Sequence, residues 1–226
     1  MNYEFYGISG SPNSWRAQFA MEVKGLSYTS HRLDPSKGEH KTPEHIGLNP
    51  HGKVPVLKSG SFIIYESIAI IAFLDQKHPE PPLLGNTTEQ TGHIWQRTFE
   101  VMNYARDSIN NGVVRPLIRG QAQRQGPSIQ IAASQAHQDL KWVEALLGRE
   151  PFLAGPTLSL ADITYMPIIQ GLIRAGGRED AAPLSLGFDD FTNQFPAISK
   201  WLNRIETTPG YDAAYPPHWR QPVTTD

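Results

Sequence analysis

The chain has 226 residues, a formal net charge of −2 and no cysteine. Its length suits one large or two small domains, and its near-neutral charge gives no electrostatic case for binding nucleic acid or an anionic membrane. The absence of cysteine excludes disulfides, cysteine metal ligands and a cysteine nucleophile. The histidines are dispersed, no apolar run reaches the roughly 20 residues of a membrane span, and the N-terminus lacks a signal-peptide pattern. We therefore expect a cytoplasmic protein without a metal site.

The first 78 residues alternate short strand patterns with helical patterns. Strands are predicted at residues 3–8, 27–33, 53–57 and 62–65, and helices at residues 14–24, 43–48 and 66–78. The sequence therefore predicts a small mixed domain with the element order β-α-β-α-β-β-α.

A proline-rich segment separates this part of the chain from a helical part. Residues 79–88, PEPPLLGNTT, contain three prolines and one glycine, which is typical of a domain boundary. Helices are predicted at residues 89–119, 128–148, 160–175 and 198–207, and no strand pattern follows residue 78. We expect a first domain over residues 1–80, a linker over 81–88 and an all-helical domain over 89–226.

A cluster of small polar residues stands between the first predicted strand and the first predicted helix. The stretch SGSPNSWR, residues 9–16, holds three serines, whereas a helix needs a single N-cap. The sequence thus offers more hydroxyl groups here than capping requires.

Two dipeptides could present further groups to a ligand. Pro55 cannot donate to a sheet, and a cis Val54–Pro55 bond would turn the main chain of Val54 toward a cleft, although a plain edge proline is an equal alternative. Glu66 and Ser67 could cap a helix, or they could bind the head group of an amino acid at the helix N-terminus. Neither pattern decides between its two interpretations.

The order and spacing of several motifs resemble the cytosolic glutathione S-transferases. The motifs are SPNSWR at 11–16, GEHK at 38–41, NPHGKVPVL at 49–57, YESIAI at 65–70, FLAGPTLSLADI at 152–163 and YPPHWR at 215–220. This resemblance implies an α/β thioredoxin-like N-terminal domain followed by an all-α C-terminal domain. The serine motif is similar to the phi and tau classes and SWR to the zeta class, and we expect a serine-type bacterial or fungal member.

The resemblance implies a glutathione site, residue by residue. Ser11 matches the family's thiol-contacting serine, while Ser14 would cap the helix. Tyr6, which resembles the tyrosine of other classes, and Asn13 are alternative donors to the thiol. The other contacts with glutathione would come from His40 and Lys53 at its glycine end, Val54 and Pro55 at its cysteinyl part, and Glu66 and Ser67 at its γ-glutamyl head. An ordinary solvated loop remains the alternative for His40 and Lys53.

The resemblance also implies a second substrate, a small hydrophobic electrophile. Its pocket would be lined by Met102, Tyr104 and Arg106, and also by Trp15, although a helical stripe such as residues 99–111 more often belongs to a core or a dimer surface. Ser159 and Asp162 resemble the family's capping box, and we interpret them as structural.

The implied function is an enzyme that conjugates its co-substrate glutathione to a small electrophile, as a cytoplasmic homodimer active in detoxification. One alternative is a low-turnover glutathione-binding or regulatory protein of the same fold. Another is a glutathione-dependent isomerase of the maleylacetoacetate type, which SWR suggests. Relatives with cysteine in place of Ser11 run thiol–disulfide exchange, which a chain without cysteine is not expected to perform.

Overall fold

The computed structural model describes residues 2–220, which form two compact units. The first unit holds residues 2–83 and also residues 207–220, and the second holds residues 84–206. We predicted a linker at 81–88 and a helical domain through to the C-terminus, so the return of residues 207–220 to the first unit differs from that prediction. Within residues 2–220, no helix is long and apolar enough to cross a bilayer. The same residues contain no group of three or more His, Asp or Glu side chains placed to hold a metal ion.

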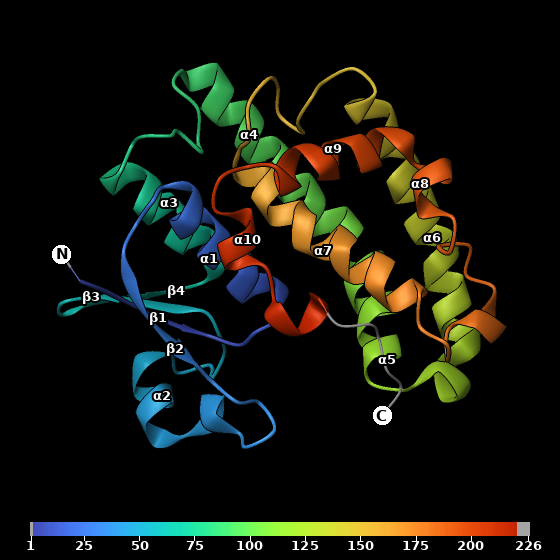
Figure 1. Ribbon diagram of the computed structural model, residues 1–226, viewed down its shortest axis with the longest axis horizontal. Coiled ribbons are helices and arrows are strands. Elements are labelled where there is room, and N and C mark those ends of the chain that lie inside the picture. Colours follow the sequence, from blue (N-terminus) through green and yellow to red (C-terminus); the bar gives the residue numbers. More distant parts are fainter. Residues whose placement is uncertain (1, 221–226) are drawn as a thin grey trace. The chain divides into compact units, whose positions relative to one another are not determined.

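The first unit is a four-stranded sheet with helices on both faces (Figure 1). Its strands are β1 (Tyr3–Gly7), β2 (Tyr28–Arg32), β3 (Val56–Ser59) and β4 (Phe62–Tyr65), and its first helices are α1 (Pro12–Val23), η1 (Glu39–Lys41), α2 (Pro43–Leu48) and α3 (Ser67–Lys77). The spatial order is β2-β1-β3-β4, with β2 parallel to β1, β3 antiparallel to β1 and β4 antiparallel to β3. In Figure 1, α1 and α3 lie on one side of the sheet and α2 on the other. The predicted element order is confirmed.

Strand β3 begins later than predicted. We expected a strand over residues 53–57, but β3 starts at Val56, directly after Pro55. Proline has no N–H to donate to a ladder, so the sheet pairing begins only beyond it.

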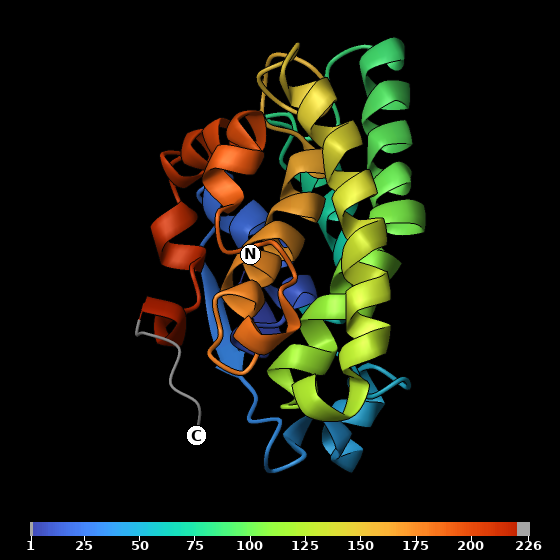
Figure 2. The same ribbon diagram turned by 90° about the vertical axis from the view of Figure 1, so that its right-hand side faces the viewer.

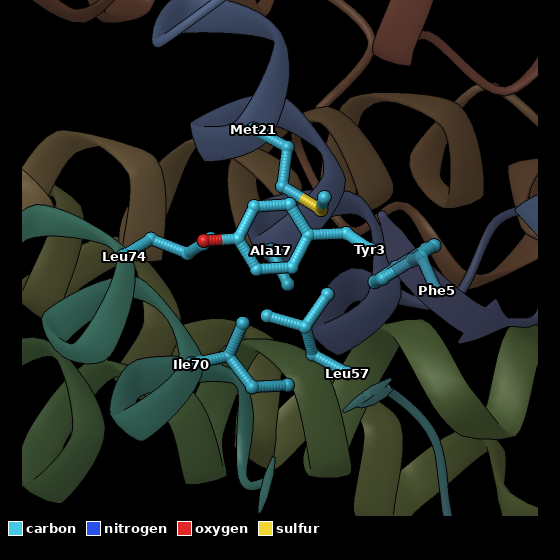
Figure 3. Close-up of a cluster of buried hydrophobic side chains, with 7 residues drawn as sticks. All are labelled: Tyr3, Phe5, Ala17, Met21, Leu57, Ile70 and Leu74. Atoms are coloured by element: carbon cyan, nitrogen blue, oxygen red, sulfur yellow. The ribbon is translucent and has the colours of Figure 1, made fainter. Parts of the chain in front are cut away.

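Alternation along the strands builds the core between the sheet and helices α1 and α3. Figure 3 shows the cluster at its centre, which contains Tyr3, Phe5, Ala17, Met21, Leu57, Ile70 and Leu74. Every second residue of β1 points into this cluster, because successive strand side chains face opposite sides of a sheet. The residues between them, Glu4 and Tyr6, therefore face the side covered by α2.

A buried ion pair joins α1 to α3 and to the segment that follows α3. Lys24 Nζ lies 2.7 Å from Asp75 Oδ1, and the two side chains are 0% and 7% exposed. Lys24 Nζ also donates to the carbonyl oxygens of His78 (2.6 Å) and Pro81 (2.8 Å), and Leu83 N donates to Asp75 Oδ1 (2.8 Å). The two buried charges thus have both a counter-charge and hydrogen-bond partners.

Replacing Asp75 by Ala is expected to reduce the free energy of unfolding by about 3 kcal/mol, because the Lys24 ammonium then stays buried without its counter-charge. The double variant Lys24→Met/Asp75→Leu should be less destabilised than Asp75→Ala, because it buries no charge. Urea unfolding measures both effects. An Asp75→Ala loss below that of the double variant would contradict this account.

Helices make up the second unit, with one isolated β-bridge between Phe152 and Gly155 among its described residues. They are α4 (Thr88–Glu100), η2 (Val101–Val114), α5 (Arg115–Ile118), α6 (Ala122–Leu147), α7 (Leu160–Gly176), η3 (Ala182–Leu184), α8 (Phe191–Gln194) and α9 (Pro196–Glu206). Figure 2 shows the long helices of this unit running side by side. The chain then returns to the first unit with α10 (Tyr211–Ala214) and η4 (Pro217–Arg220).

Two helix predictions in this unit need correction. The helix expected over 89–119 divides into α4, η2 and α5, and η2 is a π-helix in which, at its end, Arg115 N donates to Asn110 O, five residues back. The helix expected from residue 128 starts at Ala122 and contains Pro127. A proline inside a helix removes one main-chain hydrogen bond. The remaining hydrogen bonds and the packing of this 26-residue helix compensate for that loss.

Candidate functional site

Three of the segments predicted to bind a ligand lie at the same end of the sheet in the first unit. Val56, where β3 starts, pairs with Tyr6 near the end of β1 and with Tyr65 at the end of β4. The loop after β1, the loop before β3 and the turn after β4 therefore share one end of the sheet. These segments contain Ser11, Val54, Pro55, Glu66 and Ser67.

Ser11, rather than Ser14, is the N-cap of α1. Its Oγ accepts a hydrogen bond from Ser14 N at 3.4 Å, while Ser14 Oγ accepts from Ile8 N at 3.1 Å. Our expectation that Ser14 caps the helix was wrong, because Pro12 takes the first helical position, which proline favours, and so moves the cap to Ser11. A hydroxyl has one proton and two lone pairs, so capping leaves the Ser11 proton available for a ligand.

The two alternative donors differ in their placement. Asn13 lies in the first turn of α1 and is partly exposed. Tyr6 faces the α2 side of the sheet, where its hydroxyl donates to Glu4 Oε2 at 3.1 Å and its ring stacks on His31 at 4.4 Å between centroids. Burial and the hydrogen bond to Glu4 raise the pKa of the Tyr6 phenol. Tyr6 is thus poorly placed to donate to a thiolate near α1.

The loop before β3 is held through one carbonyl group. The Val54–Pro55 peptide bond is cis, as one of our two interpretations required. The Lys53 carbonyl oxygen accepts from Asn49 Nδ2 at 2.9 Å and lies 3.0 Å from His45 Nε2, and both of those side chains are buried. The main-chain hydrogen bonds of the described loops and turns include none to or from Val54, so its N–H and C=O can pair with a ligand.

The turn after β4 places a strained residue at the start of α3. Glu66 is the N-cap of α3, is exposed, and has φ +70°, a conformation that glycine favours. Non-glycine residues held there cost about 1–3 kcal/mol and cluster at functional sites. The next residue, Ser67, is buried, and its Oγ accepts from Arg16 Nη1 at 3.5 Å. The site thus offers a carboxylate, a hydroxyl and the first N–H groups of α3.

Sequence reasoning missed Arg16 as part of this site. Its side chain is only 2% exposed, although it was noted in the sequence only as the end of the SWR motif. A charged residue among the apolar residues of α1 was the signal that could have identified it, because arginine is seldom fully buried without a partner. The Arg16 guanidinium places a positive charge next to the Ser67 hydroxyl.

The turn that carries His40 lies beside Lys53. A Cβ built on Gly52 would lie 3.1 Å from the His40 carbonyl oxygen, and Gly52 has φ +54°, so only glycine suits this close approach. Lys53 is exposed, and His40 Nδ1 is buried without a hydrogen-bond partner among the described residues. The structure brings these two predicted residues together, whether they serve a ligand or a solvated loop.

Trp15, predicted to line the electrophile pocket, is buried. Its side chain is 2% exposed, and its ring packs against those of Tyr211, Tyr215 and Trp219. Residues returning from the C-terminal part of the chain cover its ring. Trp15 lines a cavity of about 150 Å³ with residues of the loop after β1 and of this C-terminal part, so its place in the electrophile pocket stays a prediction.

The remaining predicted residues lie in the second unit. Met102 and Arg106 are partly buried on η2, and Tyr104 is 69% exposed and lines a cavity of about 340 Å³ with Trp142. The capping box at the start of α7 is confirmed, since Asp162 Oδ2 accepts from Ser159 N at 2.9 Å.

Comparison with known proteins places this architecture in one family. Residues 1–76 match the glutathione S-transferase N-terminal domain, and residues 114–204 match the C-terminal domain. Glutathione S-transferase F10 of Arabidopsis thaliana is 32% identical over 172 residues, which is 74% of this chain and 79% of that protein. Glutathione S-transferase 4 of Zea mays is 30% identical over 208 residues, or 90% of this chain and 87% of that protein.

A solved structure supports the same assignment. The crystal structure of a glutathione S-transferase from the Antarctic clam Laternula elliptica matches with a TM-score of 0.83 at 26% identity, covering 98% of this chain and 95% of that one. The expected combination of a thioredoxin-like N-terminal domain with a helical C-terminal domain is thereby confirmed. The chain belongs to the glutathione S-transferase family.

Proposed function

We propose that Ser11 activates the thiol of bound glutathione in this glutathione transferase, for attack on a small hydrophobic electrophile. The observation that supports the proposal most is the position of Ser11 at the N-terminus of α1, at the sheet end from which the Val54 and Glu66 segments also open. A hydroxyl proton and the positive end of a helix are both suited to stabilise a thiolate. This arrangement also supports the assignment to a serine-type class.

A hydrogen bond from Ser11 can supply the free energy that thiol activation requires. A thiol with a pKa near about 8.5 is mostly protonated at neutral pH, and the thiolate is the nucleophile. Lowering the pKa by about two units takes about 2.7 kcal/mol, and a hydrogen bond to a charged group supplies about 1.5–3 kcal/mol. The thiol proton passes to water, the thiolate sulfur forms a bond to the electrophilic carbon, and the leaving group departs with its electron pair.

Other groups at the same sheet end would hold glutathione in place. The main-chain N–H and C=O of Val54 suit the cysteinyl peptide, and the Ser67 hydroxyl with the α3 N–H groups suits the γ-glutamyl carboxylate. Glu66 would pair with the γ-glutamyl ammonium group. His40 and Lys53 would donate to the glycine carboxylate. Glutathione thus acts as a co-substrate, and no metal is needed in this scheme.

Replacing Glu66 by Gly is expected to weaken glutathione binding tenfold or more, since a hydrogen bond to a charged group contributes about 1.5–3 kcal/mol. The free energy of unfolding should stay the same or rise, because glycine adopts φ +70° without strain. Isothermal titration calorimetry and urea unfolding measure the two effects. The matched variant Glu66→Gln keeps the side chain's size and should also bind weakly. Wild-type affinity in both variants would contradict the role of this carboxylate.

We further propose that the protein acts in detoxification in the cytoplasm and that it is a homodimer. The homodimer is expected because glutathione S-transferases are generally dimeric. Three aromatic side chains on α4, η2 and α6 are unusually exposed: Phe99 (52%), Tyr104 (69%) and Trp142 (43%). Exposed apolar groups of this size favour an interface. Analytical ultracentrifugation should show a dimer, and Trp142→Glu should shift it toward monomer. A wild-type monomer at micromolar concentration would contradict the proposal.

The two alternative functions make different predictions. A binding or regulatory protein of this fold would bind glutathione without lowering its thiol pKa. The isomerase alternative rested on SWR, and Trp15 and Arg16 of that motif are both buried, so packing accounts for them. Conjugation of glutathione to a small aryl halide, measured against Ser11→Ala, distinguishes the transferase from the binding protein.

A further inference from the structure

A tight turn carries the chain from β1 to Ser11. Ser11 N donates to Ile8 O at 3.1 Å, which closes a four-residue turn, and Gly10 in its third position has φ +80°, as a type II turn requires. The cap bond from Ser14 N to Ser11 Oγ is 3.4 Å long, beyond the usual range for this kind of hydrogen bond. Local hydrogen bonds therefore hold the Ser11 hydroxyl only loosely.

The C-terminal segment, residues 211–220, packs against this turn from outside. Ser9 Oγ lies 3.2 Å from His218 Nδ1. A Cβ built on Gly10 would lie 3.0 Å from His218 Nε2 and 3.1 Å from Trp219 Nε1. The C-terminal segment thus contacts the main chain immediately before Ser11, at a position where only glycine leaves enough room.

The C-terminal segment also holds the first turns of α1. The rings of Tyr211, Tyr215 and Trp219 lie 6.1, 5.3 and 5.4 Å from the Trp15 ring, between centroids. Trp15 N in turn donates to Ser11 O at 2.9 Å. Figure 1 shows α10 of this segment beside α1. The chain is therefore held on both sides of Ser11 by residues about 200 positions away in sequence.

We propose that the C-terminal segment is a positioning element for Ser11, with Trp219 as its principal side chain. Trp219 packs on both Gly10 and Trp15, and so restricts the turn that aims the Ser11 hydroxyl at the glutathione sulfur. Reacting groups need placement to within about 0.5 Å, and a misplacement of about 1 Å can cost a hundredfold in rate. This inference rests on the proposed function of Ser11, and Trp219 itself acts without touching glutathione.

Replacing Trp219 by Ala is expected to raise the pKa of the bound glutathione thiol and to lower kcat about tenfold, because the Ser11 hydroxyl is then less restricted. The Kd for glutathione should be nearly unchanged, since the groups proposed to hold its two ends lie elsewhere. Trp219→Phe, which keeps an aromatic ring against Trp15, should restore the wild-type thiol pKa. Arg220→Ala is the matched control, because it removes an exposed ion pair with Asp212 and a cation–π contact with Tyr215 in the same segment but leaves the Trp219 side chain in place.

The decisive experiment titrates the thiolate absorbance of bound glutathione in Trp219→Ala, Ser11→Ala and the double variant. The inference predicts that Trp219→Ala shifts the thiol pKa in the presence of Ser11 and adds no shift in its absence. A folded Trp219→Ala with the wild-type thiol pKa would overturn it, as would a shift that persists without Ser11. If Trp219→Ala does not fold, His218→Ala takes its place in the same cycle. A wild-type thiol pKa in Ser11→Ala would instead overturn the proposed function, and the inference with it.

Discussion

Ser11→Ala is expected to lower kcat/KM for glutathione conjugation about 25-fold at neutral pH. Loss of the hydroxyl donor should return the bound thiol from a pKa of about 6.5 to its ordinary value of about 8.5, which lowers the thiolate fraction at pH 7 from about 76% to about 3%. The pH profile of kcat/KM should therefore move to higher pH, and the rate of the variant should approach that of the wild type in alkaline solution. Steady-state kinetics across pH with a small aryl halide measures both effects.

Because Ser11 also caps α1, its replacement needs controls that separate folding from activation. Ser11→Ala should cost about 0.5–2 kcal/mol of stability through the lost cap. Ser11→Asp keeps a good capping acceptor but has no proton to donate at neutral pH, so it should be stable and inactive. Ser11→Thr keeps both functions and should retain most activity. Full activity in Ser11→Asp would show that the hydroxyl proton plays no part in thiol activation.

Asp162→Ala is expected to reduce the free energy of unfolding by about 4–5 kcal/mol, because it leaves several buried donors without an acceptor. Asp162 is 0% exposed. Its Oδ1 accepts from Leu153 N and Trp201 Nε1, each at 2.8 Å, and its Oδ2 accepts from Ser159 N at 2.9 Å and Ser159 Oγ at 2.7 Å. Three separate parts of the second unit therefore depend on this carboxylate. Urea unfolding measures the loss.

Two related variants test whether the Asp162 carboxylate or the Ser159 cap contributes more to the free energy of unfolding. Ser159→Ala removes one donor and should cost only about 1 kcal/mol. Asp162→Asn keeps the shape but turns an amide N–H₂ toward donor groups, so it should be nearly as damaging as Asp162→Ala. Equal, small losses in all three variants would contradict the network.

Local patterns in the sequence predicted much of the fold. The aromatic and Ile-containing composition of residues 3–8 and the helical spacing in α1 and α3 are short-range signals, and the structure confirms the elements they predicted. The capping box of Ser159 and Asp162 could also be predicted from the sequence, because its two members lie three residues apart in the first turn of one helix. The cis bond at Val54–Pro55 remained one of two interpretations, since the sequence does not distinguish the isomers.

Features that depend on distant contacts were missed. Residues 207–220 return to the first unit, and nothing in their own periodicity indicates a partner as far away as Trp15. The same contact explains why Trp15 is covered rather than exposed. The N-cap falls on Ser11 instead of Ser14 because of a single local detail, Pro12 at the first helical position. The burial of Arg16 behind Ser67 required the packing of α1 against α3.

We propose above all that Ser11 lowers the pKa of the glutathione thiol. The most direct test is a titration of the thiolate absorbance of glutathione bound to the wild type and to Ser11→Ala. We predict a bound thiol pKa about two units below that of free glutathione in the wild type, and a return toward the free value in Ser11→Ala. An unshifted pKa in the wild type, or a lowered pKa that survives in Ser11→Ala, would contradict the account.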